Sequence, residues 1–238
     1  MSARGGPGAC VRPVVRSLWC QPLPVGSGPS LPYKLAIFDF DGTLADSLPW
    51  FQEVINTVAV RFDFKTVDDA EIEILRRCDA REIMRRLGVP MWKLPMIGRH
   101  MKALMARDIG RIALFPGVDA MLRDLAGRGV GLALVTSNSE ENVRRVLGPE
   151  NAALIGCFEC GAAIFGKRAK FRRVLKRCGV APAEAICIGD EIRDLEAARG
   201  AGIAFGGVSW GYATTEALAA RSPTLLFGRV DEVVRRIA

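Results

Sequence analysis

A chain of 238 residues, half of them hydrophobic, can bury one sizeable core, which excludes disorder of the whole. No apolar run approaches the ~18 residues needed to span a bilayer, so we predict a soluble protein without a membrane partner. The net charge of +7 suits a polyanion, but the bases gather in two places. Residues 1–34 carry four bases and residues 163–180 carry seven, with no acid in either segment.

The amino-terminal segment, residues 1–32, is rich in Gly, Pro and Ser and shows no sustained periodicity, so we expect a disordered extension outside the fold. Arg12, Pro13 and Arg16 interrupt its nearest approach to a secretory signal. The seven cysteines are an odd number scattered along the chain, which fits a reducing compartment better than a disulfide framework. The sequence therefore predicts a cytoplasmic protein.

The first folded element is an apolar run, residues 35–40, which is typical of a buried strand in a parallel sheet. Asp39 and Asp41 come at its carboxyl end, where open α/β sheets bind their ligands. Residues two apart on a strand share a side, so both carboxylates can face one pocket. Gly42 then permits a sharp exit of the chain. We predict a functional site at this point.

Residues 48–114 form a predicted block of helices without a strand. Capping residues mark three helix starts, at Asp46-Ser47 with Pro49 in the first turn, at Asp68-Asp69 and at Asp79. The predicted helices cover 49–61, a segment from 69, a segment from 80 to about 88, and 91–112. Because the block interrupts the chain directly after the first strand, we expect a mobile cap above the end of that strand.

From residue 115 onward, helical and strand patterns alternate. The predicted helices cover 118–128, 139–147, 168–178 and 191–199, and the predicted strands cover 131–136, 154–159, 185–190 and 203–208, before a final β/α pair at 224–237. This alternation predicts a doubly wound, mostly parallel, Rossmann-like α/β sheet with right-handed crossovers. The core would comprise residues 33–47 and 115–238, with the helical cap inserted between them.

Polar residues stand at the ends of two later strands and at the starts of two helices. Thr136 and Ser137 follow a strand, Lys167 begins a basic helix, Asp190 ends the next strand, and Asp194 comes one helical turn later. If the sheet assembles as predicted, all of them meet the edge where the first strand ends. A hydroxyl, backbone N–H groups at a helix start and a lysine together suit a phosphate.

A cation is expected beside the four acids Asp39, Asp41, Asp190 and Asp194. Two unit charges ~4 Å apart interact by about 4 kcal/mol at an effective dielectric constant of about 20, so clustered carboxylates need a positive partner. Oxygen ligands with room for water favour Mg²⁺ over zinc. The sequence therefore predicts a magnesium site next to a phosphate site.

In this order the residues resemble the four motifs of the haloacid dehalogenase superfamily, over residues 35–238. The motifs are residues 39–43, the strand that ends in Thr136, Lys167, and residues 189–194. The helical insertion between the first two motifs resembles the cap of the phosphoglycolate phosphatase-like members. The resemblance implies that Asp39 is a nucleophile that forms an aspartyl-phosphate.

The same resemblance implies the other roles. Asp41 would protonate the leaving group and then activate water, while Thr136, Ser137 and Lys167 would bind the phosphoryl group. Asp190, with the Asp39 carboxylate and the Asp41 carbonyl, would ligate Mg²⁺, and Asp194 would support that site.

The function implied is a Mg²⁺-dependent phosphatase that hydrolyses a small phosphate monoester, similar to phosphoglycolate phosphatase, in a monomer or homodimer. Two alternatives stay open. A sugar phosphomutase of the same superfamily uses the same kind of site, and a non-catalytic protein could bind a polyanion through the basic helix. Nucleic acid is not expected as a partner, because the bases of that helix are typical of a solvated face.

Four details bear on these predictions. Members with this cap often have Pro-Asp-Pro after the motif lysine, which is missing here, so Lys170 is an alternative to Lys167. The bases of the predicted cap include candidates for contact with an anionic leaving group, although most are expected to be solvated: Arg76, Arg77, Arg81, Arg85 and Arg86. Of these, Arg77 and Arg81 are the ones to test. Residues 161–168 nearly match a phosphate-binding P-loop, but an arginine stands where a Ser or Thr must bind Mg²⁺. A lone C-x-x-C pair at residues 157–160 is predicted to be structural.

Overall fold

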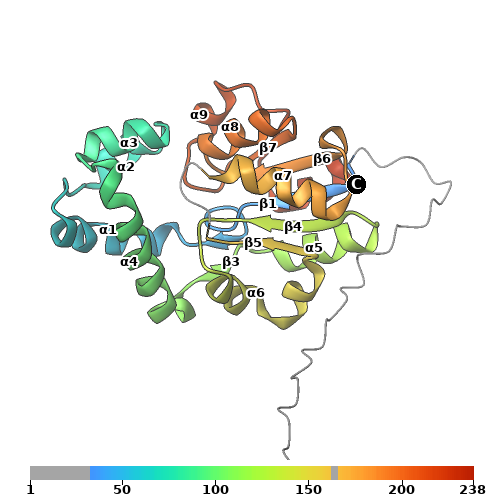
Figure 1. Cartoon of the computed structure of the whole chain (residues 1–238), viewed down its shortest axis with the longest axis horizontal. Coiled ribbons are helices and arrows are strands. Elements are labelled where there is room, and N and C mark those ends of the chain that lie inside the picture. The colour runs from blue at the N-terminus through green and yellow to red at the C-terminus, as the bar shows by residue number, and fades with distance from the viewer. Residues whose placement is uncertain (1–32, 162–165) are drawn as a thin grey trace, which may run out of the picture.

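The computed structural model describes residues 33–161 and 166–238 (Figure 1). The predicted extension, residues 1–32, lies outside the described residues, as does the middle of the P-loop-like segment. None of the helices in the described part has the length and hydropathy needed to cross a membrane. No disulfide bond joins the cysteines of that part, which are Cys78, Cys157, Cys160, Cys178 and Cys187.

A six-stranded sheet, in which every pairing is parallel, forms the core. Its strand order is β5-β4-β1-β6-β7-β8. The strands are β1 (Leu35–Phe38), β4 (Gly131–Val135), β5 (Cys157–Glu159), β6 (Ala185–Gly189), β7 (Ala204–Val208) and β8 (Leu225–Phe227). The predicted Rossmann-like α/β fold is confirmed. Because β1 lies between β4 and β6, the strand order reverses beside it, and such a reversal opens a crevice for a ligand at the carboxyl ends.

Helices cover both faces of this sheet (Figure 1). Side chains of β1 alternate, so that Ala36 and Phe38 pack into one apolar cluster and Leu35 and Ile37 into the other. The first cluster includes residues of α5 (Val118–Gly127), α6 (Glu140–Leu154) and α10 (Val230–Ile237). The second includes residues of α7 (Lys167–Cys178), α8 (Ile192–Ala201) and α9 (Thr215–Ala219). Burial on both faces explains why β1 is a continuous apolar run.

Register places the carboxyl ends of the central strands at one edge. Phe38, the last residue of β1, is paired with Leu134 of β4 and with Ile188 of β6. The Asp39 amide then donates a hydrogen bond of 2.9 Å to the Ile188 carbonyl. The residues that follow β1, β4 and β6 therefore begin side by side.

The helical insertion, residues 48–114, contains α1 (Leu48–Phe62), α2 (Asp69–Leu75), α3 (Ala80–Leu87) and α4 (Leu94–Arg107), with 3₁₀ turns at Met91–Lys93 and Ile109–Arg111. These helices stand apart from the sheet at the left of Figure 1. They share a small apolar cluster of their own, formed by Ile55, Val67, Leu87 and Val89. Asp68 and Asp79 accept hydrogen bonds from amides of the helices that they begin, as predicted.

Four local features differ from the prediction. A two-residue antiparallel pair, β2 (Ala45–Asp46) with β3 (Ala113–Leu114), joins the two ends of the insertion, so the block is not free of strand. The short helix α9 was not predicted. The strand expected over 154–159 is confined to β5, because α6 continues to Leu154. Gly148 interrupts α6 with φ 72°, and Pro149 begins its second segment, a position that proline favours.

Candidate active site

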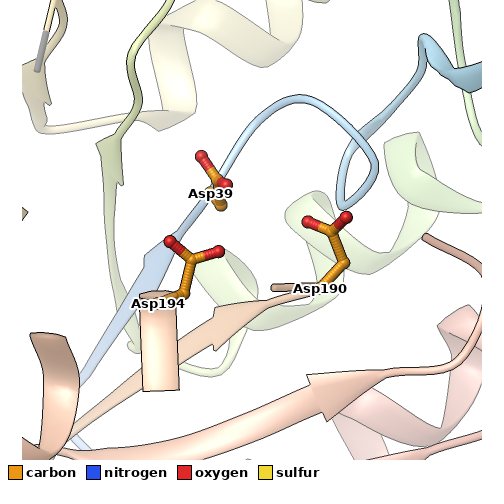
Figure 2. Close-up of side chains that lie close together, drawn as sticks. All are labelled: Asp39, Asp190 and Asp194. Atoms are coloured by element: carbon orange, nitrogen blue, oxygen red, sulfur yellow. The ribbon is translucent and has the colours of Figure 1, made fainter. Parts of the chain in front are cut away.

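Three aspartates that the sequence places at different points of the chain meet at the carboxyl ends of the strands. Asp39 follows β1, Asp190 follows β6, and Asp194 lies in the first turn of α8. Each offers a carboxylate oxygen within 4.8 Å of those of the other two, and all three side chains are buried (Figure 2). In the described part of the chain, this is the one cluster of acids, histidines or cysteines suited to a metal ion.

Lys167 connects two members of this cluster. Its Nζ lies 2.6 Å from Oδ2 of Asp39 and 2.6 Å from Oδ1 of Asp194, and its side chain is only 3% exposed. Burial alone would lower the pKa of the Lys167 ammonium, but Asp194 and Asp39 together raise it, so the lysine stays charged. Lys170 points elsewhere, with its Nζ on the Cys160 carbonyl and 3.7 Å from Glu159. Of the two candidate lysines, the fold brings Lys167 to the acids.

The electrostatics of the cluster favour a cation. Burial raises the pKa of Asp39 well above its ordinary value, Asp194 raises it further, and Lys167 opposes both. Burial, with Glu191 and Asp194, raises the pKa of Asp190 to about 8. Asp194 differs, because Lys167 and Arg193 overcome its burial and lower its pKa. Its Oδ2 is nevertheless buried without a hydrogen-bond partner. Three buried carboxylates, of which two contact Lys167 and one keeps an oxygen without a hydrogen-bond partner, fit a hard divalent cation.

Asp190 is held in place by two donors. The Thr43 hydroxyl donates to Oδ1 at 2.8 Å, and the Tyr212 amide donates to Oδ2 at 2.8 Å. Two glycines make this packing possible. A Cβ on Gly42, whose φ is +74°, would lie 2.2 Å from Oδ2 of Asp190, and a Cβ on Gly211 would lie 2.2 Å from its Cβ. These contacts fix the carboxylate on the side that faces the cluster.

The Asp41 carboxylate is outside the three-acid cluster. It is half-buried and accepts hydrogen bonds from Nδ2 of Asn138, the shorter at 3.2 Å. Burial raises the pKa of Asp41, while hydrogen bonds from Ser47 and Asn138 oppose that rise. A carboxyl group with a raised pKa keeps its proton to a higher pH than an ordinary aspartate, which suits a general acid. The predicted metal contact of Asp41 concerns its carbonyl oxygen and stays a prediction.

Asn138 was missed by the sequence reasoning. It is 4% exposed, and its backbone N–H donates a 3.0 Å hydrogen bond to the Thr136 hydroxyl. Thr136 itself is buried at the end of β4, next to half-buried Ser137, so both predicted phosphate-binding residues lie at the expected edge. The signal for Asn138 was its position in the polar loop directly after that strand.

Two predicted cap residues lie on the surface. Arg77 and Arg81 are both exposed, and Arg77 lines an open groove of about 460 Å³ on the insertion. The contact between the insertion and the site loops comes from other residues. Met105 of α4 packs against Asn138, and the Asn142 side chain donates to the Lys102 carbonyl at 3.2 Å. Substrate contact by Arg77 and Arg81 therefore stays a prediction.

Comparison with known proteins points to one family. A model of the haloacid dehalogenase-like hydrolases matches residues 36–208. A phosphoglycolate phosphatase of Synechococcus elongatus is 32% identical over 202 residues, which are 84% of this chain and 95% of that protein. Phosphoglycolate phosphatase 1 of Pseudomonas aeruginosa is 25% identical over 213 residues, 84% of this chain and 78% of the relative.

The fold has close counterparts among solved structures. A hydrolase described as a haloacid dehalogenase-like family protein, from Streptococcus pneumoniae, superimposes with a TM-score of 0.71 at 18% identity. The superposition covers 87% of this chain and 99% of the other. Fold, family model and relatives together define the class: this protein is a hydrolase of the phosphatase type. It belongs to the haloacid dehalogenase-like hydrolase family, in which it is similar to the phosphoglycolate phosphatases, and the predicted resemblance is confirmed.

Proposed function

We propose that this protein is a Mg²⁺-dependent phosphatase that hydrolyses a small phosphate monoester through an aspartyl-phosphate intermediate on Asp39. The observation that carries the proposal is the buried Lys167 ammonium, which contacts both Asp39 and Asp194 beside Asp190. A carboxylate can attack a phosphoryl group only if the charge of both is neutralised, and a fixed cation in a dry site does this at little reorganisation cost. Relatives named phosphoglycolate phosphatases make 2-phosphoglycolate the first substrate to test.

The proposed reaction has two steps. In the first, a carboxylate oxygen of Asp39 attacks phosphorus, the bond from phosphorus to the ester oxygen breaks, and Asp41 gives its proton to the leaving alkoxide. In the second, Asp41 takes a proton from water, the water oxygen attacks phosphorus, and the acyl-phosphate bond breaks to release phosphate and restore Asp39. Thr136, Ser137 and Lys167 bind the phosphoryl oxygens. The raised pKa of Asp41 supports its role as the acid.

The residues present fit Mg²⁺. Carboxylates of Asp39, Asp190 and Asp194 supply the oxygen ligands that this ion prefers, directly or through water, and Oδ2 of Asp194 has no hydrogen-bond partner that would compete. When bound, the ion would neutralise charge on the phosphoryl oxygens.

We include the insertion in the proposal as a cap that excludes water during transfer and selects the substrate. We also propose a reducing, cytoplasmic compartment, because the cysteines are an odd number scattered along the sequence.

Release of inorganic phosphate from 2-phosphoglycolate, sugar phosphates and nucleotides, with and without Mg²⁺, tests the proposal. A phosphatase releases phosphate in proportion to the alcohol formed, whereas a phosphomutase would give an isomeric sugar phosphate without net release. The structure does not favour the alternative of a polyanion-binding protein. Arg173 and Arg177 of the basic helix pair with Glu159, at 3.4 Å and 3.3 Å, so part of the positive charge of this helix is already neutralised. Tight, salt-sensitive nucleic-acid binding without phosphate release would contradict the proposed function.

Metal removal should abolish activity. EDTA is expected to stop phosphate release by the unaltered protein, and added Mg²⁺ should restore it. Asp190→Ala removes one carboxylate of the cluster, so we expect a Mg²⁺ requirement raised by about tenfold or more, with partial recovery at high Mg²⁺. The measurement is initial rate against free Mg²⁺. Full activity of the unaltered protein in EDTA would exclude the metal assignment.

Gly42→Ala should displace the Asp190 carboxylate in addition to straining the backbone. At φ +74° an alanine costs about 1 kcal/mol, and its Cβ would also displace the Asp190 carboxylate. Gly88 is the matched control, because its φ is +68° and nothing lies within 4 Å of its Cβ position. We expect Gly88→Ala to lower the free energy of unfolding by a similar amount and keep its activity.

Gly42→Ala should instead lose about 100-fold or more in rate, the size of effect expected when a catalytic group is misplaced by about 1 Å. Urea unfolding and phosphate release measure the two effects separately. Equal activity of the Gly42 and Gly88 variants would mean that the position of Asp190 does not matter.

A further inference from the structure

We propose that Arg76, at the carboxyl end of α2, is a positioning residue that couples docking of the insertion to metal binding by Asp190. The inference rests on the proposed function, because it concerns the metal site of that function. It follows from a loop of the core, residues 210–214, which contacts Asp190 on one side and Arg76 on the other.

The inner side of this loop is fitted to Asp190. The Tyr212 amide donates to the Asp190 carboxylate at 2.8 Å, and the Ala213 amide donates to its main-chain carbonyl at 3.3 Å. Gly211 packs so closely that a Cβ would lie 2.5 Å from the Gly42 carbonyl oxygen as well as 2.2 Å from the Asp190 Cβ. A shift of the loop would therefore move the carboxylate, because packed groups cannot move independently.

The outer side of the loop is bound by Arg76. Its Nε donates to the Tyr212 carbonyl at 2.9 Å and its Nη2 to the Gly211 carbonyl at 3.3 Å, while the Thr214 amide donates to the Arg76 carbonyl at 3.0 Å. The Arg76 side chain is 26% exposed, so these contacts are partly shielded from water. A planar guanidinium that spans two successive carbonyls fixes the orientation of a loop in a way that a lysine cannot.

The first helix of the insertion contacts the same loop. The Tyr212 hydroxyl lies 3.1 Å from the hydroxyl of Ser47, which directly precedes α1, and the Tyr212 ring packs edge-on against Phe51 at a centroid distance of 5.6 Å. Tyr212 is therefore held by the insertion through its ring and its carbonyl, and by Ser47 of the core through its hydroxyl, while its amide holds Asp190. Movement of the insertion away from the core would release the ring and carbonyl contacts.

Two physical effects of Arg76 on Mg²⁺ binding have opposite signs. As a positive charge near the site, Arg76 disfavours a second cation, so its removal would tighten Mg²⁺ binding by electrostatics alone. As a positioning residue, Arg76 holds the loop that orients Asp190, so its removal would weaken Mg²⁺ binding. The sign of the change therefore distinguishes the two. Coupling is also reciprocal, so bound Mg²⁺ should stabilise the contact between the insertion and the loop.

The experiment is calorimetric titration of Mg²⁺ into the protein without substrate, for the unaltered chain, Arg76→Ala, Arg76→Lys and Arg85→Ala. We expect both Arg76 variants to bind Mg²⁺ about tenfold more weakly, within the range usual for coupled sites. Arg76→Lys keeps the charge but loses the paired carbonyl contact. Arg85 is the matched control, because like Arg76 it pairs with a glutamate three residues earlier, Glu82, as Arg76 does with Glu73. Its variant should bind Mg²⁺ normally.

Hydrogen exchange supplies a second readout that is independent of catalysis. In the unaltered protein, Mg²⁺ should slow exchange of the Thr214 amide, which donates to the Arg76 carbonyl, and this protection should be lost in Arg76→Ala. Unchanged or tighter Mg²⁺ binding by a folded Arg76→Ala would overturn the inference while leaving the proposed function intact. Failure of the unaltered protein to bind Mg²⁺ would overturn both.

Discussion

Asp39→Asn is expected to lower turnover by at least about 10⁴-fold, the scale seen when a nucleophile of a concerted site is removed. An amide in place of the carboxylate cannot form the acyl-phosphate, and Lys167 loses one of its two anionic contacts. The fold should be unaffected or more stable, because burial raises the pKa of Asp39 and a neutral side chain avoids the cost of that buried charge. Phosphate release and thermal unfolding of the purified variant measure the two effects.

Asp46→Asn is a suitable control for Asp39→Asn, because Asp46 lies in β2 near the same segment but is exposed. It should change neither activity nor stability beyond about 0.5 kcal/mol, as is usual for surface substitutions. Activity of Asp39→Asn close to that of the unaltered protein would exclude the covalent mechanism. A large drop in its melting temperature would instead show that Asp39 serves the fold.

Lys167→Met is expected to damage both stability and activity. The substitution keeps much of the side-chain volume but leaves Asp39 and Asp194 buried without their shared cation, and breaking a buried pair in this way costs about 3–5 kcal/mol. Activity should fall by about 10²–10³-fold or more, because a fixed positive charge is lost where phosphoryl charge develops. Urea unfolding with and without Mg²⁺ measures the first effect. Mg²⁺ should recover part of the lost stability, since it supplies positive charge to the same carboxylates.

Two further variants make the prediction for Lys167 specific. Lys167→Met combined with Asp194→Asn should be more stable than Lys167→Met alone, because the second change removes one uncompensated charge. Lys170→Met is the matched control, since its ammonium lies on the Cys160 carbonyl and near Glu159 instead of at the acid cluster. Loss of activity in Lys170→Met with an active Lys167→Met would reverse the assignment of the two lysines.

Local patterns in the sequence were sufficient for the architecture. The apolar run of β1, buried on both faces, and the alternation of helix and strand after residue 115 predict a parallel α/β sheet, which is the fold observed. Helix starts were read correctly where a short-range capping bond forms, as at Asp68 and Asp79. Ser47 shows the limit of such reading. It begins α1, but its hydroxyl lies against Tyr212 instead of capping the helix, because a tertiary partner outcompetes the local one.

The sequence by itself determined which chemistry is available, since the order and spacing of Asp39, Asp41, Lys167, Asp190 and Asp194 at strand and helix ends already indicate a phosphoryl site. Only the tertiary structure decided which groups touch. It turned Lys167 rather than Lys170 to the acids, placed the Asp41 carboxylate beside Asn138, and joined Arg76 to the loop over Asp190. The physical reason is the sequence separation of the residues that interact. Strand and helix patterns arise from neighbours within a few residues, whereas these contacts join segments 97 to 136 residues apart or depend on the direction of one helix, which packing of the whole chain sets.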